Sequence, residues 1–130
     1  MMRIGTVVMG TSDVRRAASF WKSALGYVER EPLEDDWVVL VPAGGTGVGL
    51  ALGRSESPVQ EVPRVHLDLY TDEQDTEVER LLALGAARVA WELYPQDPDF
   101  VVLADTEGNR FCVIDTTHGL TGEDIVAAIP

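Results

Sequence analysis

One short stretch of the sequence places three reactive side chains at alternate positions: His66, Asp68 and Tyr70. A period of two is the period of a β-strand, so an imidazole, a carboxylate and a phenol would share one face. An imidazole titrates near neutral pH and can move a proton or bind a metal ion, which makes this face the best candidate site. The aliphatic residues between them are expected to face the core: Val65, Leu67 and Leu69. A single histidine on a strand also suits a purely structural role, and both interpretations stay open.

The single cysteine and several aromatic residues are further candidates. Cys112 has no partner for an intramolecular disulfide, so its thiol is free to pack, to bind a metal or to react. Packing within the apolar residues 111–114 is the simplest interpretation. Four aromatic residues are candidate walls of a ligand pocket: Trp37, Tyr70, Trp91 and Tyr94. Aromatic faces bind flat or cationic molecules, but each of these rings could equally belong to the core.

Composition limits the classes of partner. The 130 residues, 45% of them hydrophobic, suffice for one domain with a packed core. The net charge of −12 would repel phosphate backbones and anionic lipid headgroups, so we expect no nucleic-acid or membrane partner. No apolar run approaches the roughly 20 residues of a membrane helix, and residues 1–5 do not lead into the apolar part of a signal peptide. We therefore expect a cytoplasmic protein.

Two segments predict amphipathic helices. The first begins after Ser12 or Asp13, which can accept hydrogen bonds from the first turn, and ends at Gly26. The second begins at residues 71–74, which have the form of a capping box, and ends at Gly85. The apolar stripes consist of Val14, Ala17, Ala18, Trp21, Ala24 and Leu25 in the first helix and of Val78, Leu81 and Leu82 in the second.

The order of expected elements occurs twice. Strands are expected at 3–9, 27–31, 36–41 and 47–52, and again at 65–70, 88–93, 99–104 and 109–115. Both helices end in Ala-Leu-Gly, and the Asp-Trp-Val-Val-Leu-Val of the first half corresponds to Asp-Phe-Val-Val-Leu-Ala in the second. This self-similarity predicts an α+β fold of two tandem βαβββ modules, 3–53 and 63–115, joined by a linker at 54–62. They form one domain, 1–120, followed by a C-terminal helix at 121–130.

These modules, together with several local motifs, resemble the vicinal oxygen chelate superfamily. The motifs are Asp13-Val14, Phe20-Trp21, Leu25-Gly26, the strand from His66 to Leu69, and Asp105-Thr106-Glu107-Gly108-Asn109-Arg110-Phe111-Cys112. The superfamily includes glyoxalase I, extradiol dioxygenases, and bleomycin and fosfomycin resistance proteins, and this chain looks closest to small glyoxalase-like proteins. The resemblance implies curved mixed sheets around a cleft, commonly in a homodimer.

The enzymes of this superfamily bind a divalent metal through residues on the first and last strands of each module. The resemblance places His66 at one such position, whereas its counterpart in the first module, Thr6 or Val7, is a poor ligand. Cys112 stands where the family usually has a metal-binding carboxylate, and Asp68 could at most add a third ligand or orient His66. We therefore expect no metal cofactor, with His66 as the single candidate ligand.

Two functions remain after other motifs are excluded. Residues 44–47 are rich in glycine but lack the lysine of a phosphate loop, and no nucleophile has a recognisable activating base. The first function is a protein that binds an aromatic or cationic organic molecule in a cleft without metal. His66, Asp68 and Tyr70 would form its polar side, and Cys112 is a further candidate ligand-binding residue. The alternative is a metal-dependent or histidine-based lyase, isomerase or dioxygenase that uses His66 as a ligand or general base.

Overall fold

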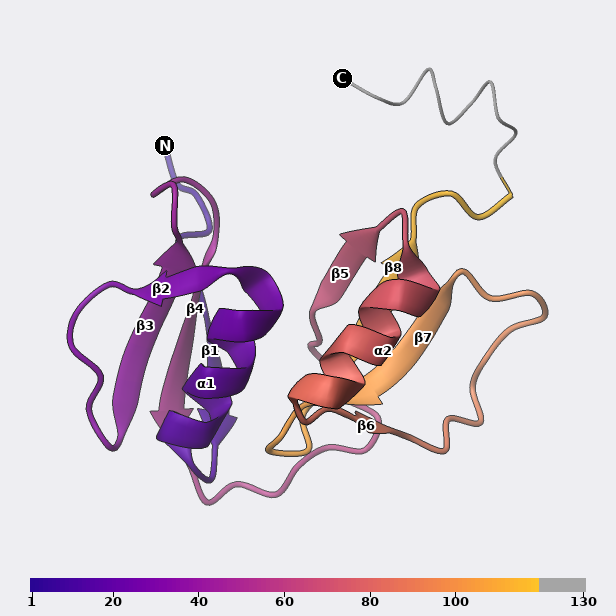
Figure 1. Cartoon of the computed structure of the whole chain (residues 1–130). Helices are drawn as coiled ribbons and strands as arrows, with labels where there is room; N and C mark the ends of the chain where they lie inside the picture. Colours follow the sequence, from indigo (N-terminus) through magenta and orange to yellow (C-terminus); the bar gives the residue numbers. More distant parts are fainter. Residues whose placement is uncertain (120–130) are drawn as a thin grey trace.

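Two four-stranded mixed sheets, each covered on one face by one helix, make up the computed structural model (Figure 1). The structure describes residues 1–119, so the helix predicted for 121–130 lies outside the described residues. The first module comprises β1 (Thr6–Thr11), α1 (Val14–Leu25), β2 (Tyr27–Glu29), β3 (Trp37–Pro42) and β4 (Gly49–Arg54). The second comprises β5 (Asp68–Thr71), α2 (Gln74–Leu84), β6 (Ala87–Arg88), β7 (Phe100–Ala104) and β8 (Arg110–Asp115).

The two sheets have the same topology, which confirms the predicted repeat. Their strand orders are β1-β4-β3-β2 and β5-β8-β7-β6, and in each the first strand pairs in parallel with the last while the other pairs are antiparallel. Helix α1 follows the predicted signals closely. The Asp13 side chain accepts a hydrogen bond from the Arg16 amide at 3.0 Å, and Gly26 ends the helix in the left-handed conformation with φ of 68°.

The start of α2 differs from the predicted capping box. Its N-cap is Glu73, whose side chain caps nothing, and Thr71 Oγ1 instead accepts a hydrogen bond from the Glu73 amide. The Gln74 side chain is occupied elsewhere, because its amide donates to the carbonyls of Val113 at 2.9 Å and Asp99 at 3.1 Å. Gln74 thus ties the helix to the sheet beneath it, and Gly85 ends the helix as predicted.

Two strands predicted for the second module are much shorter in the structure than expected. The ladder between β5 and β8 begins only at Asp68, so Val65 is 79% exposed and the expectation that it faces the core is wrong. The strand expected at 88–93 is almost absent, since β6 ends at Arg88. The next position on its partner strand is Val102, whose amide donates to the Tyr94 hydroxyl at 2.8 Å instead of extending the ladder.

One hydrophobic core runs through both modules. Trp21 of α1 is fully buried and lies edge-on to Phe111 of β8, with ring centroids 5.1 Å apart. Phe20 packs edge-on against Trp21 at 5.0 Å. These separations are typical of edge-to-face aromatic pairs. The packing of Trp21 against Phe111 therefore joins the two halves of the chain.

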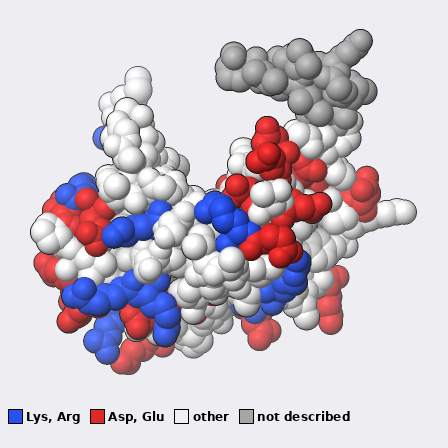
Figure 2. All heavy atoms as spheres, viewed as in Figure 1, with Lys and Arg blue, Asp and Glu red and all other residues white. Residues whose placement is uncertain are grey.

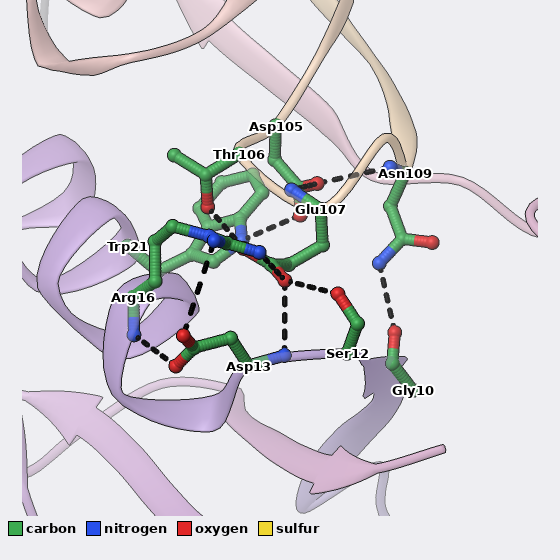
Figure 3. Close-up of polar contacts among 9 residues, drawn as sticks. All are labelled: Gly10, Ser12, Asp13, Arg16, Trp21, Asp105, Thr106, Glu107 and Asn109. Carbon is green, nitrogen blue, oxygen red and sulfur yellow. Dashed lines mark hydrogen bonds and ion pairs between the residues drawn. The ribbon is translucent and has the colours of Figure 1, made fainter. Parts of the chain in front are cut away.

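The turn between β7 and β8 locks the two modules together (Figure 3). The Glu107 side chain is only 1% exposed and accepts hydrogen bonds from Ser12 Oγ at 2.8 Å, the Asp13 amide at 3.0 Å and Arg16 Nε at 2.7 Å. A carboxylate from the second module therefore sits at the N-terminus of α1, where the helix dipole favours negative charge. Burial alone would raise the pKa of Glu107, but these donors and Thr106 outweigh it and lower the pKa to about 2.

Neither α1 nor α2, the helices within the described part of the chain, has the length and apolar character needed to cross a bilayer.

Candidate functional site

The second sheet has one face that points away from α2, which we call the open face. Leu69, Leu103 and Val113 point the other way, into the core. Because side chains alternate along a strand, their neighbours belong to the open face: Asp68 and Tyr70 on β5, Phe100 and Val102 on β7, and Arg110, Cys112 and Ile114 on β8.

A hollow of about 520 Å³ lies over the open face. Its walls are completed by Val62, Pro63 and His66 from the segment before β5, and by Trp91 and Leu93 from the segment after β6. Most of the lining is aliphatic or aromatic, with a few polar groups among it. Both the size and this composition are typical of pockets that bind small organic molecules.

Three polar side chains meet at one place on the open face. His66 Nδ1 lies 3.0 Å from Asp68 Oδ1, and Asp68 is the direct neighbour of Cys112 across the parallel β5–β8 pair. The side chains of His66 and Asp68 are 41% and 42% exposed, whereas Cys112 is 8% exposed. Burial, together with the Asp68 charge, raises the pKa of the Cys112 thiol to about 11. Cys112 is therefore a protonated thiol at neutral pH.

The first module does not repeat this cluster. Strands β1 and β5 both end three residues before their helix begins, so Thr11 corresponds to Thr71 and the counterpart of His66 is Thr6. The positions equivalent to Asp68, Arg110 and Cys112 are held by Val8, Gly49 and Ala51. The polar cluster is thus present on one of two structurally equivalent faces and missing from the other. The fold itself therefore does not require these polar side chains.

The structure brings together five of the side chains selected from sequence and leaves two elsewhere. The five that line the hollow are His66, Asp68, Tyr70, Trp91 and Cys112. Trp37 lies on the first module, 43% exposed, with its ring over Gly53. Tyr94 does not line the hollow; its hydroxyl accepts the Val102 amide, and its ring packs against Phe100 with centroids 5.2 Å apart.

Two charged residues at the hollow were not selected from sequence. Arg110 lies two residues before Cys112 on β8, and Asp99 lies directly before β7. The alternation that groups His66 with Asp68 also groups Arg110 with Cys112, so the signal was present. The sequence alone did not show that Arg110 faces the hollow, because alternation does not tell which face of a sheet is covered by the helix.

The cluster of His66, Asp68 and Cys112 has donor atoms suited to the divalent metal that the superfamily resemblance implies. Each residue offers one ligand atom, and these atoms all lie within 4.8 Å of one another. Zinc accepts imidazole, carboxylate and thiolate ligands, and catalytic zinc sites combine three protein ligands with an open position. The three residues fit such an ion, which would polarise a ligand oxygen as a Lewis acid. Binding must first displace the Cys112 proton, and the raised pKa opposes this at neutral pH.

Comparisons with known proteins agree with this architecture. A family model described as a glyoxalase-like domain matches residues 6–114. No curated protein matched the sequence. Among solved structures, the fosfomycin resistance protein FosX from Listeria monocytogenes superposes with a TM-score of 0.67 at 16% identity, covering 99% of each chain. A glyoxalase/bleomycin resistance protein/dioxygenase family enzyme from Burkholderia phytofirmans has a TM-score of 0.64 at 18% identity, over 86% of this chain and 97% of that chain. At these identities the likeness shows the fold alone.

Proposed function

The chain belongs to the family of glyoxalase-like domains, and from this premise we propose that it binds a small aromatic or cationic organic molecule over the open face. The observation that carries the proposal is the asymmetry between the modules. Both sheets are built alike, but within residues 1–119 the cluster of His66, Asp68 and Cys112 occurs on the second sheet alone, and a largely apolar hollow lies over the same face. The proposal requires no metal.

The walls of the hollow suit a flat ring. Trp91 and Phe100 are aromatic, and Val102 and Ile114 add aliphatic surface. Stacking and cation–π contacts with such walls contribute about 0.5 to 2 kcal/mol each. Tyr70, 75% exposed, stands on the same face and can cover one side of a bound ring.

The negative charge of the protein favours a ligand that carries a cationic group. Asp68 and Asp99 both line the hollow, and the whole chain carries a net charge of −12. Figure 2 shows the opposite side of the second module, the side of α2, where acidic side chains also gather. A net negative charge of this size raises the local concentration of cations around the protein.

Calorimetric titration with phenethylamine, an aromatic amine, tests this function. We expect saturable binding to the wild type and weaker binding to Asp68→Asn and Tyr70→Ala, with melting temperatures close to that of the wild type. Trp37→Ala is the matched control, because Trp37 lies on the other module. Binding that is unchanged in Asp68→Asn, or absent from the wild type, would contradict the proposal.

A second candidate is a metal-dependent lyase, isomerase or dioxygenase. It is favoured by one observation, the three ligand atoms of His66, Asp68 and Cys112 within 4.8 Å. A variant of the Listeria FosX protein, which is similar in fold, is complexed with Mn(II) and 1S,2S-dihydroxypropylphosphonic acid, and this supports the candidate. Metal content of protein purified without an affinity tag separates the two functions. Stoichiometric metal that is lost in His66→Ala and in Cys112→Ser would favour the enzyme.

A further inference from the structure

Arg110 occupies a central position at the candidate site. It is half-buried at the start of β8, on the same face as Cys112 and Ile114. It lines the hollow over the open face and also two neighbouring hollows, one beside β1 and one beside β6. Arg110 is therefore shared by all three hollows.

This guanidinium lacks a carboxylate partner within the described residues. Its Nη1 donates to the Gly108 carbonyl at 2.8 Å, but Arg110 forms no ion pair with any residue in the range 1–119. Six other basic side chains in that range do form ion pairs: Arg15, Arg16, Lys22, Arg30, Arg80 and Arg88. The remaining arginines, Arg3, Arg54 and Arg64, are exposed to solvent. Although carboxylates are abundant in this acidic chain, none within residues 1–119 pairs with Arg110, so its remaining N–H donors are available to an anionic ligand.

We propose that Arg110 binds a carboxylate group of the ligand. A guanidinium has five N–H donors in one plane and matches a carboxylate with two parallel hydrogen bonds. Asp68 lies beside Cys112 on the neighbouring strand, and Cys112 follows Arg110 by two residues on β8, so all three share the open face. The hollow thus offers both a cationic and an anionic side chain, among aromatic and aliphatic walls. This inference rests on the proposed function and narrows its ligand to an aromatic molecule with an amine and a carboxylate.

A carboxylate fits this hollow better than a doubly charged phosphate does. Asp68 and Asp99 line the same space, so a second negative charge on the ligand would be repelled by both. Lysine at position 110 would keep the positive charge but could not form the paired, coplanar hydrogen bonds of arginine.

Three probes that differ by one group each test the inference: phenethylamine carries the amine, phenylpropanoate the carboxylate, and phenylalanine both. We expect the wild type to bind phenylalanine about tenfold or more tightly than phenethylamine, the usual effect of a charge-assisted hydrogen bond. Arg110→Gln should abolish this preference, so that the variant binds phenylalanine no more tightly than phenethylamine, and Arg110→Lys should retain part of it. Arg54→Gln is the control, because Arg54 is exposed and lines none of the three hollows.

The outcomes separate this inference from the proposed function. A wild type that binds phenethylamine and phenylalanine equally, or an Arg110→Gln variant that keeps the preference, overturns the role of Arg110 while the proposed function stands. Binding of none of the three probes defeats both. Inorganic phosphate that competes as well as phenylpropanoate would show that Arg110 takes any anion and would overturn the carboxylate assignment. Melting curves of the variants establish that each is folded.

Discussion

The indole N–H of Trp21 donates a hydrogen bond to the carboxylate of Asp105, 3.0 Å away and 84 residues further along the chain. Both residues are buried, Trp21 in α1 and Asp105 in the turn after β7 (Figure 3). The same carboxylate accepts the amides of Glu107 and Asn109, each at 2.9 Å. Burial raises the pKa of Asp105 despite these donors. One side chain therefore holds the turn in shape and fixes it to the other module.

We expect Trp21→Phe to destabilise the fold by about 2 kcal/mol or more. The variant removes one donor from a buried carboxylate, which costs about 1 to 3 kcal/mol, and it leaves a small void. Urea denaturation followed by circular dichroism measures the change. Trp37→Phe is the control, because that ring is 43% exposed and no hydrogen bond holds it, so its effect should stay below about 1 kcal/mol. Equal effects of the two substitutions would contradict the anchoring role of Trp21.

Glu107 should make stability depend on pH in acid. Its pKa in the folded protein is about 2, below the ordinary value of 4.5, so its contribution is present above pH 4.5 and is lost as the pH falls toward 2. A difference of about 2.5 pH units corresponds to about 3 kcal/mol of unfolding free energy. The gap in unfolding free energy between the wild type and Glu107→Gln should therefore be large at pH 7 and shrink steadily below pH 5. A gap that is constant between pH 7 and pH 3 would contradict this account.

Cys112 should react slowly with iodoacetamide in the native protein. The thiolate is the reactive species, and the pKa of this buried thiol is about 11. Because the Asp68 charge contributes to that rise, Asp68→Asn should increase the labelling rate at a fixed pH. Asp99→Asn is the matched control, since Asp99 lines the same hollow but is not among the groups that shift the Cys112 pKa. Mass spectrometry follows the reaction, and a native rate equal to that of the urea-unfolded chain would refute the protonated thiol.

We expect the chain to form a homodimer. Strands β1 and β5 each have one edge without a strand partner, and exposed apolar residues lie on or near them: Ile4, Val8, Val65 and Tyr70. Unpaired edges and exposed apolar surface favour pairing with a second copy of the chain. Light scattering at micromolar concentration should give about twice the chain mass of 14.2 kDa. A mass near that of one chain would count against the dimer.

The sequence predicted the parts of the fold that local signals determine. Asp13, Gly26 and Gly85 mark helix ends because capping depends on neighbours within one turn. The repeat predicted two equivalent modules because each local signal occurs twice. The strand expected at 88–93 failed for a non-local reason, since the Tyr94 hydroxyl takes the Val102 amide that a longer β6 would need.

The candidate site was only partly accessible from sequence. Alternation correctly groups His66, Asp68 and Tyr70, but it gives no reason to separate Trp91, which lines the hollow, from Tyr94, which does not. Arg110 was missed because its importance depends on the absence of an ion pair within the described chain, and pairing is a tertiary property. The cluster with Cys112 likewise depends on the register between β5 and β8, which joins residues far apart in sequence.

The most direct test of the central claim uses the two modules as each other's control. Amide chemical shifts of the isotopically labelled protein are followed by NMR while phenylalanine is added. We predict saturable shifts at Asp68, Val102 and Cys112, and none at the equivalent first-module positions Val8 and Ala51. Shifts spread evenly over both sheets, or no shift at saturating ligand, would contradict binding at the open face of the second module.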